Sequence, residues 1–187
     1  MIERAIFLDR DGVIIKSIYD EKQDIDRAPW SISEVEFVPN AFEALREMYN
    51  MGYSLFIVTN QPDYVKGFVE LNKLKEIREY INLMLYNEEI GIRDDYYCFH
   101  HPDYCACMCR KPSPYSLIQA SEKYKLNLKK SWMIGDRNTD IVCGINAETK
   151  TIKITNEKES NLADFTAKDL KEAVEIIKFC DNLKKKE

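Results

Sequence analysis

Short apolar runs alternate with helical periodicities along this chain, and that alternation restricts its fold more than any other feature. Five runs rich in β-branched and aromatic residues predict strands, at residues 4–8, 54–58, 96–99, 132–135 and 151–154. Apolar residues at helical spacing predict helices around residues 42–49, 71–85, 117–124 and 170–177. Strands that alternate with helices form a parallel sheet covered on both faces. We therefore expect an α/β fold: a doubly wound parallel sheet with helices on both faces.

Length and local signals favour a single domain. The 187 residues suit one hydrophobic core, and no linker or repeat divides them, so we expect one domain over residues 1–187. Residues 17–37 are mostly polar and predict a long loop. Ser113 and Pro114 predict a helix start, with Ser113 as the N-cap and Pro114 at the first helical position. Residues 183–187 predict a frayed tail.

The charge pattern argues against nucleic-acid and membrane partners. The formal net charge is −5 with both signs mixed along the chain, so no wide basic field attracts a nucleic-acid backbone. No apolar run approaches the ~18 residues that a membrane span needs, and the amino-terminal residues lack a signal-peptide pattern. We therefore expect a cytoplasmic protein, and a monomer.

Polar side chains stand where the predicted strands end. Asp9 and Asp11 follow the first strand two residues apart, so both carboxylates point to one side, and Gly12 lets the chain turn away. In a doubly wound sheet, such residues meet at the carboxyl ends of the strands. The other members of this set are Thr59 and Asn60 after the second strand, Lys111, and Asp136 and Asp140 after the fourth strand.

This set is what phosphoryl transfer through an aspartyl-phosphate requires. Asp9 can attack phosphorus once a cation screens its charge, and Asp9 with Asp136 supplies the hard oxygen ligands that suit Mg²⁺. Asp11, held protonated by its neighbours, can donate to the departing alkoxide and later take a proton from water. Lys111 and Thr59 can hold the phosphoryl oxygens as charge shifts among them.

Four short motifs carry a resemblance to a known superfamily. The stretches "DRDGVI", "VTNQ", "RKP" and "GDRNTD" resemble the motifs of haloacid dehalogenase (HAD) superfamily phosphatases. Together with the Cys/His insert and residues 27–63, they resemble the branch that contains D-glycero-D-manno-heptose 1,7-bisphosphate phosphatases and histidinol-phosphate phosphatases. The resemblance covers roughly residues 4–154.

The resemblance implies roles for individual residues. It implies Asp9 as the nucleophile, Asp11 as the acid/base, and Thr59 and Lys111 as phosphoryl stabilisers. It also implies a HAD-like fold and Mg²⁺ bound by Asp9, the backbone carbonyl of Asp11, and Asp136. The residues that we expect to contact substrate are Asn60, Gln61, Arg110, Lys111 and Arg137, with Tyr19 and Asp20 as further candidates.

The stretches between the motifs are too short for a separate cap domain, so we expect an open site. The resemblance implies that the Cys/His loop and the 17–37 loop shape substrate access in place of a cap.

Four cysteines and two histidines crowd into residues 98–112. In a reducing compartment, clustered cysteines favour metal binding over disulfides. Cys105 is a spare that could replace one of the two neighbouring cysteines, and His101 could replace the preceding histidine or cap the loop. Four protein ligands leave no open coordination position, which indicates a structural zinc site. The ligands that we expect are Cys98, His100, Cys107 and Cys109.

A zinc-stapled loop would fix the residues that follow it. Arg110 and Lys111 leave the loop directly after its last ligand, so ordering by the metal would place both side chains. Lys111 would then reach the transferring phosphate. Arg110, a rigid fork, suits a second phosphate at the far end of the substrate. Cys143 and Cys180 stand apart on predicted helices, and we expect both to be buried.

The site residues favour a Mg²⁺-dependent phosphatase, and the resemblance implies that its substrate is a small phosphorylated sugar, namely the 7-phosphate of heptose 1,7-bisphosphate. Its product would feed nucleotide-activated heptose for lipopolysaccharide or capsule. Histidinol-phosphate phosphatase shares every motif and is the main alternative. A polynucleotide 3′-phosphatase would lack the zinc loop and need a basic groove. A non-catalytic, zinc-stapled interaction module would not need an acid/base pair beside a cation site.

Overall fold

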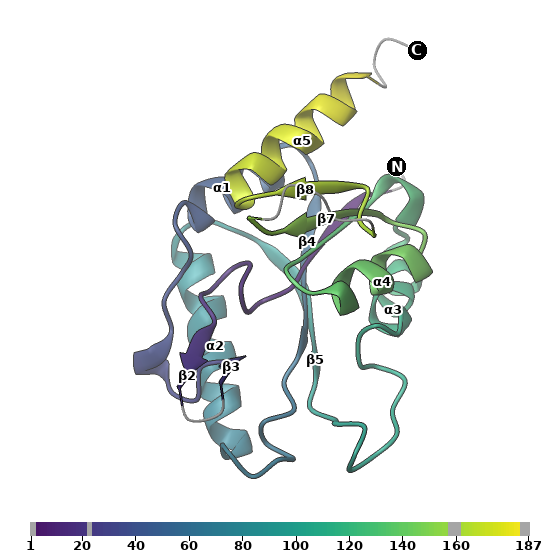
Figure 1. Ribbon diagram of the computed structural model, residues 1–187. Helices are drawn as coiled ribbons and strands as arrows, with labels where there is room; N and C mark the ends of the chain where they lie inside the picture. Colours follow the sequence, from purple (N-terminus) through teal and green to yellow (C-terminus); the bar gives the residue numbers. More distant parts are fainter. Residues whose placement is uncertain (1–2, 22–23, 157–161, 184–187) are drawn as a thin grey trace.

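A six-stranded sheet forms the centre of the protein, in a computed structural model that describes residues 3–21, 24–156 and 162–183 (Figure 1). Every pairing in this sheet is parallel, and the strand order is β5-β4-β1-β6-β7-β8. From β1 the chain adds β4 and β5 on one side and then returns to add β6, β7 and β8 on the other. The strands are β1 (Ala5–Leu8), β4 (Ser54–Asn60), β5 (Ile92–Cys98), β6 (Trp132–Gly135), β7 (Lys150–Ile154) and β8 (Phe165–Ala167).

Helices cover both faces of the sheet, as the alternation of the sequence predicts. Along β1, Ile6 and Leu8 pack into the core under α1, α2 and α5, whereas Ala5 and Phe7 pack into a second core under α3 and α4. Figure 1 shows these two groups of helices on opposite sides of the strands. The doubly wound α/β fold is therefore confirmed. The helices are α1 (Ala41–Asn50), α2 (Leu71–Asn87), α3 (Tyr115–Tyr124), α4 (Asn138–Asn146) and α5 (Leu170–Leu183).

The segment expected to be a long loop contains regular structure. A small antiparallel hairpin of β2 (Ile18–Asp20) and β3 (Ile25–Arg27) precedes the 3₁₀ turn η1 (Ile32–Glu34). Trp30 anchors this segment, because its Nε1 donates to Asp63 Oδ2 at 2.8 Å and its ring stacks on Phe68 at 5.6 Å. The loop prediction for residues 17–37 was thus wrong where the hairpin forms. The polar faces of these short strands gave no apolar alternation to detect.

Other boundaries also differ from the sequence predictions. Strand β5 begins at Ile92 rather than residue 96, because Asp94 and Asp95 satisfy their charges with Lys123 and Arg78. Strand β8 was not predicted, and helix α4 was predicted only as a helix that carries Cys143, without bounds. Helix α3 begins at Tyr115 with Pro114 as its N-cap, one residue later than the Ser113 cap that we expected.

Helix α5 ends at Leu183, the first residue of the expected tail, and residues 184–187 lie outside the described residues. Cys143 and Cys180 are buried on α4 and α5, as expected. Among the described residues, no helix has the length and apolar character required to cross a membrane.

Candidate active site

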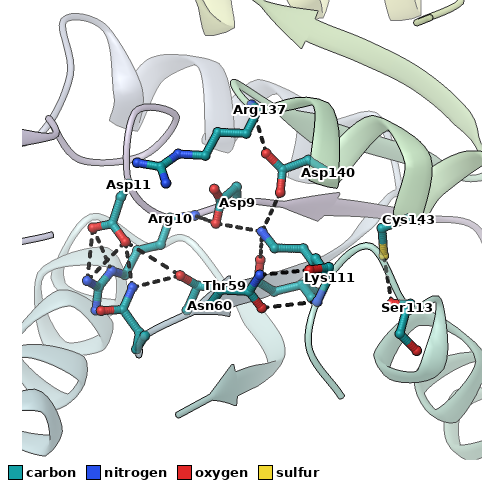
Figure 2. Close-up of polar contacts among 12 residues, drawn as sticks. Asp9, Arg10, Asp11, Thr59, Asn60, Lys111, Ser113, Arg137, Asp140 and Cys143 are labelled. Carbon is teal, nitrogen blue, oxygen red and sulfur yellow. Dashed lines mark hydrogen bonds and ion pairs between the residues drawn. The ribbon is translucent and has the colours of Figure 1, made fainter. Parts of the chain in front are cut away.

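Asp9 stands at the centre of the carboxyl edge of the sheet. It follows the buried strand β1, and its backbone N–H donates to the Ile134 carbonyl of the neighbouring β6 at 2.9 Å. Its Oδ1 lies 2.8 Å from Lys111 Nζ and accepts the Arg10 backbone N–H at 2.7 Å (Figure 2). Only 6% of Asp9 is exposed. The side chain expected to be the nucleophile is therefore held on two sides and faces the switch point of the sheet.

Lys111 reaches the same point from the loop after β5. Its Nζ lies 2.6 Å from Asp140 Oδ1, donates to the Val58 carbonyl at 2.7 Å, and contacts Asp9. Burial alone would lower the pKa of Lys111, but the charges of Asp9 and Asp140 raise it above its ordinary value. The side chain therefore remains an ammonium group, the form that can stabilise a phosphoryl oxygen.

Asp136 completes a group of three carboxylates with Asp9 and Asp140. One oxygen from each lies within 4.8 Å of the others, and Asp136 Oδ1 has no hydrogen-bond partner among the described residues. Burial first, and then the charges of Asp9 and Asp140, raises the pKa of Asp136 to about 7. Three carboxylates beside one ammonium group leave uncompensated negative charge, and their oxygen donors suit Mg²⁺.

Gly12 allows this close approach. Its φ of +81° lies in the left-handed region, and a Cβ at this position would stand 2.3 Å from Asp136 Oδ2. Any side chain would both strain the backbone and displace the carboxylate. The turn expected from sequence after the two aspartates therefore has a second role, which is to leave room for Asp136.

Asp11 faces away from Lys111 and contacts three other side chains. Its carboxylate accepts Arg10 Nε at 3.1 Å, Arg10 Nη2 at 2.9 Å and Gln61 Nε2 at 2.5 Å, and Thr59 Oγ1 lies 3.5 Å away. Figure 2 shows Asp11 and Arg10 together at one side of Asp9. These donors suit a carboxylate, whereas we expected neighbours that keep Asp11 protonated. The acid/base role of Asp11 stays a prediction.

The two residues after Thr59 connect parts of the site. The side chain of Asn60 binds the backbone of Lys111, with Nδ2 donating to its carbonyl and Oδ1 accepting its N–H, both at 3.1 Å. Gln61 is 1% exposed, and its Nε2 also donates to Thr59 Oγ1 at 2.8 Å. Its backbone N–H donates to the Cys98 carbonyl at 2.7 Å. Asn60 lines the cavity described below, and Gln61 is not among its lining residues.

The expected zinc ligands lie together at the end of β5. Cys98 Sγ is 3.6 Å from His100 Nδ1, 3.7 Å from Cys107 Sγ and 3.3 Å from Cys109 Sγ. Tetrahedral zinc–thiolate coordination places two sulfurs about 3.7 Å apart, so the spacing suits Zn²⁺. Burial raises the pKa of the Cys98 thiol to about 12, and a cation would favour its thiolate form. The four residues form one candidate metal cluster.

The alternative ligands are placed outside that cluster. Cys105 and His101 are not among the grouped ligand atoms. His101 Nδ1 accepts the Asp103 backbone N–H at 3.2 Å, and its ring contacts Tyr104. His101 thus caps the loop, which was the second role that its sequence position allowed.

A cavity of ≈ 600 Å³ opens over the carboxylates. Arg110 and Arg137 line it, and their contact with substrate stays a prediction. Arg110 Nη1 donates to the His100 carbonyl at 3.0 Å, so the Cys/His loop holds its guanidinium. Tyr19 and Asp20 are not among the lining residues. Further cations that line the cavity and that the sequence did not single out are Arg27, Lys66 and Lys153.

The sequence did not predict the roles of two residues in the site. Asp140 stood out only as a carboxylate after a strand, but it is wholly buried and holds Lys111. Its other oxygen accepts the Arg137 backbone N–H at 2.9 Å, so it also caps α4. Arg10 is wholly buried although it lies between two aspartates. Both residues could have been recognised as candidates from the sequence, because each is charged and stands within one of the four motifs.

The fold and the site together define a HAD-like hydrolase. A doubly wound sheet carries a carboxylate pair after β1, a hydroxyl at the end of β4, a lysine after β5 and carboxylates after β6. The HAD-hydrolase-like family model matches residues 108–184. A D-glycero-β-D-manno-heptose-1,7-bisphosphate 7-phosphatase of Helicobacter pylori is 33% identical over 181 residues, which cover 94% of this chain and 98% of the relative. The chain belongs to the heptose-1,7-bisphosphate 7-phosphatase family of HAD phosphatases.

Two further comparisons agree with this family. A D-glycero-α-D-manno-heptose-1,7-bisphosphate 7-phosphatase of Campylobacter jejuni is 33% identical over 95% of this chain and 98% of its own length. The crystal structure of a D,D-heptose 1,7-bisphosphate phosphatase from B. bronchiseptica, complexed with magnesium and phosphate, superposes with a TM-score of 0.78. It is 21% identical and covers 93% of this chain and 97% of that chain, which establishes the shared fold.

Proposed function

We propose that this protein is a Mg²⁺-dependent phosphatase that removes the C7 phosphate of D-glycero-D-manno-heptose 1,7-bisphosphate. The observation that carries the proposal is the convergence of Asp9, Lys111 and Asp136 at one point, in a chain whose relatives are named for this reaction. We further propose that residues 1–187 act as one domain, in the cytoplasm, and that the product serves nucleotide-activated heptose synthesis for lipopolysaccharide or capsule.

Asp9 is the nucleophile in this proposal. Its free oxygen attacks phosphorus, the bond between phosphorus and the C7 oxygen breaks, and an aspartyl-phosphate forms on Asp9. Asp11 enters the reaction in its protonated form, gives that proton to the departing alkoxide, and regains a proton from the water that hydrolyses the intermediate. Asp9, Asp136 and the backbone carbonyl of Asp11 would hold Mg²⁺, whose charge screens the carboxylate from the phosphate.

Lys111 and Thr59 stabilise the phosphoryl oxygens. Lys111 carries its charge into a site from which most water is excluded, because only 2% of the side chain is exposed. Asp140 holds Lys111 Nζ in its position beside Asp9. Thr59 is 1% exposed, and its hydroxyl is oriented by Gln61. In this proposal Gln61 acts behind the site rather than on the substrate.

The second phosphate of the substrate would bind Arg110 and Arg137 at the rim of the cavity. Both residues line the cavity that Asp9, Asn60 and Lys111 also line. A fork-shaped donor gives a phosphate two parallel hydrogen bonds. The relatives are named for both the α and the β anomer, so both anomers of the substrate should be assayed.

A structural Zn²⁺ at Cys98, His100, Cys107 and Cys109 completes the proposal. The loop from residue 99 to residue 114 contains no helix or strand, so a metal would supply the order that hydrogen bonds do not.

Phosphate release tests the proposal. Wild type and Asp9→Asn are assayed with Mg²⁺ on the α- and β-heptose 1,7-bisphosphates and on histidinol phosphate. We expect wild type to turn over at least one heptose bisphosphate with a kcat/KM about a hundredfold above that for histidinol phosphate, because charge-assisted bonds to the second phosphate are lost. Asp9→Asn should be inactive. Preference for histidinol phosphate would favour the alternative enzyme, and equal or absent rates for both proteins would favour the interaction module.

A further inference from the structure

Arg10 is a buried cation that the proposed reaction does not use directly. It stands between Asp9 and Asp11 and is 0% exposed. An arginine rarely loses all contact with water, because the desolvation of its charge must be offset by close partners. The partner here is the adjacent carboxylate of Asp11.

The contact between Arg10 and Asp11 is a fork. Nε and Nη2 of Arg10 both donate to Asp11 Oδ1, at 3.1 and 2.9 Å, and Nη2 also donates to Oδ2 at 3.1 Å. Gln61 holds Oδ2 from another direction at 2.5 Å. A planar guanidinium that contacts both oxygens restricts rotation of the carboxylate about its χ2 torsion, which is otherwise broad.

The surroundings fix Arg10 itself. Its carbonyl accepts the backbone N–H groups of Ile14 at 2.9 Å and Ile15 at 3.0 Å, so its backbone is part of a tight turn. Its guanidinium carbon lies 5.7 Å from the centre of the Tyr97 ring, within cation–π range. The fork therefore belongs to the rigid interior of the protein rather than to a mobile surface side chain.

We propose that Arg10 is a positioning residue, which fixes the orientation of the Asp11 carboxylate toward the leaving-group oxygen and then toward the hydrolytic water. The proposal rests on the function proposed above and concerns how Asp11 performs its part. Arg10 itself does not touch the substrate, because it is not among the residues that line the cavity.

Comparing a poor with a good leaving group can reveal whether Asp11 is correctly placed. A sugar alkoxide is a poor leaving group and needs the proton from a well-placed Asp11, whereas p-nitrophenolate leaves without one. The parameter kcat/KM reports on steps up to the first irreversible one, which here is formation of the aspartyl-phosphate. Misplacing Asp11 should therefore lower kcat/KM for the heptose bisphosphate far more than for p-nitrophenyl phosphate.

The experiment compares Arg10→Met, Arg10→Lys, Asp11→Asn and the double variant R10M/D11N on both substrates with Mg²⁺. For Arg10→Met we expect about a hundredfold loss of kcat/KM on the heptose bisphosphate, the scale of general acid catalysis, and less than about tenfold on p-nitrophenyl phosphate. Arg10→Lys keeps the charge but not the fork and should lie between Arg10→Met and wild type. In the Asp11→Asn background, Arg10→Met should add little, because the two residues act as a unit.

Arg4→Met is the matched control. Arg4 also pairs with an aspartate, Asp181 at 2.7 Å, and lies over a tyrosine ring, Tyr53 at 4.1 Å, but it is remote from the cavity. It should lower thermal stability without changing the ratio of the two kcat/KM values. If Arg10→Met does not fold, the ratio for Arg10→Lys decides the question.

The outcomes separate the two proposals. A ratio that falls in Asp11→Asn but stays at the wild-type value in the folded Arg10 variant would overturn the role of Arg10 alone. Additive losses in R10M/D11N, or an Arg10 variant more active than wild type, would overturn it as well. Equal activity of Asp11→Asn and wild type on both substrates would instead contradict the proposed function.

Discussion

The side-chain amide of Asn60 brackets the backbone of Lys111, with its nitrogen on the lysine carbonyl and its oxygen on the lysine N–H. Asn60 ends the rigid strand β4, whereas Lys111 follows an irregular loop. The amide therefore transfers the order of the sheet to the residue that holds the phosphoryl group in our proposal. The adjacent Gln61 N–H donates to the Cys98 carbonyl and connects β4 to the first candidate zinc ligand.

Because Asn60 holds the backbone of Lys111, its replacement should lower kcat with little change in KM. Asn60→Asp keeps the size of the side chain but replaces the donor to the Lys111 carbonyl with an oxygen. We expect kcat to fall about tenfold to a hundredfold, because Lys111 would act on the transition state from a displaced position. Steady-state kinetics measure the effect. Asn82→Asp, which changes a half-buried amide that donates to Asp95 and does not line the cavity, is the control and should leave kcat unchanged. An Asn60→Asp variant that changes KM alone would mean that Asn60 contacts substrate instead.

If the Cys/His loop holds a structural zinc, removal of zinc and removal of Mg²⁺ should have different effects on activity. Strong chelation of zinc should abolish activity irreversibly, because the loop that precedes Arg110 and Lys111 loses the metal that orders it. Removal of Mg²⁺ should be reversed by adding it back. Zinc analysis and phosphate release on the same samples measure this. A protein with no zinc and normal activity would refute the structural site.

The choice of zinc ligands makes a separate prediction. Cys98→Ser should lose zinc and lower the melting temperature, because Cys98 lies within 3.7 Å of the three other candidate ligands. Cys105→Ser should keep zinc, since Cys105 lies outside the cluster. Metal content of the two purified variants checks the assignment. Zinc loss in Cys105→Ser would show that the spare cysteine is a ligand.

The parts of the site that the sequence predicts are those set by the ends of strands. Asp9, Thr59 and Asp136 come directly from apolar runs, so their meeting point follows from the parallel sheet. The grouping of Cys98, His100, Cys107 and Cys109 follows from residue type and spacing. The fold class follows from the alternation alone.

What the sequence does not predict depends on ion pairs between distant residues. The pairs of Asp94 with Lys123 and Asp95 with Arg78 allow charged residues to sit in β5, so its first half has no apolar pattern. Asp140 could not be assigned to Lys111 without the fold, because the pair joins α4 to a loop after β5. Asn60 was expected to contact substrate, since nothing in the sequence shows that its amide is occupied by Lys111.

Arg110 predicts substrate selectivity. Arg110→Ala should lower kcat/KM for the heptose bisphosphate about tenfold to a hundredfold, the value of a charge-assisted contact with phosphate. The same change should affect heptose 7-phosphate, which lacks the second phosphate, only slightly. Zinc content serves as the control, because Arg110 also donates to the His100 carbonyl. Equal losses on both substrates would remove Arg110 from selectivity.

Tyr53 predicts how stability depends on alkaline pH. The ring is 2% exposed, and its hydroxyl lies between Trp132 Nε1 at 3.2 Å and Asp181 at 3.0 Å. Burial first, with a further contribution from Asp181, raises the pKa of Tyr53 to about 12 from an ordinary value of 10.0. Between these values the unfolded chain loses a proton that the folded chain keeps. The stability that Tyr53 contributes is therefore complete below pH 10 and is lost as the pH rises through about 12.

Urea unfolding from pH 8 to pH 12 measures this loss. Wild type should exceed Tyr53→Phe in unfolding free energy at pH 8, because the variant lacks the hydrogen bond to Asp181. That difference should shrink toward pH 12, by at most about 2–3 kcal/mol. Comparing the two proteins cancels the contributions of the half-buried Tyr96 and Tyr97, since burial raises the pKa of each to about 12 and both are present in each protein. Tyr86→Phe, which alters a ring that is 78% exposed, is the control and should keep a constant difference from wild type. A constant difference for Tyr53→Phe as well would show that the hydroxyl of Tyr53 ionises equally in both states.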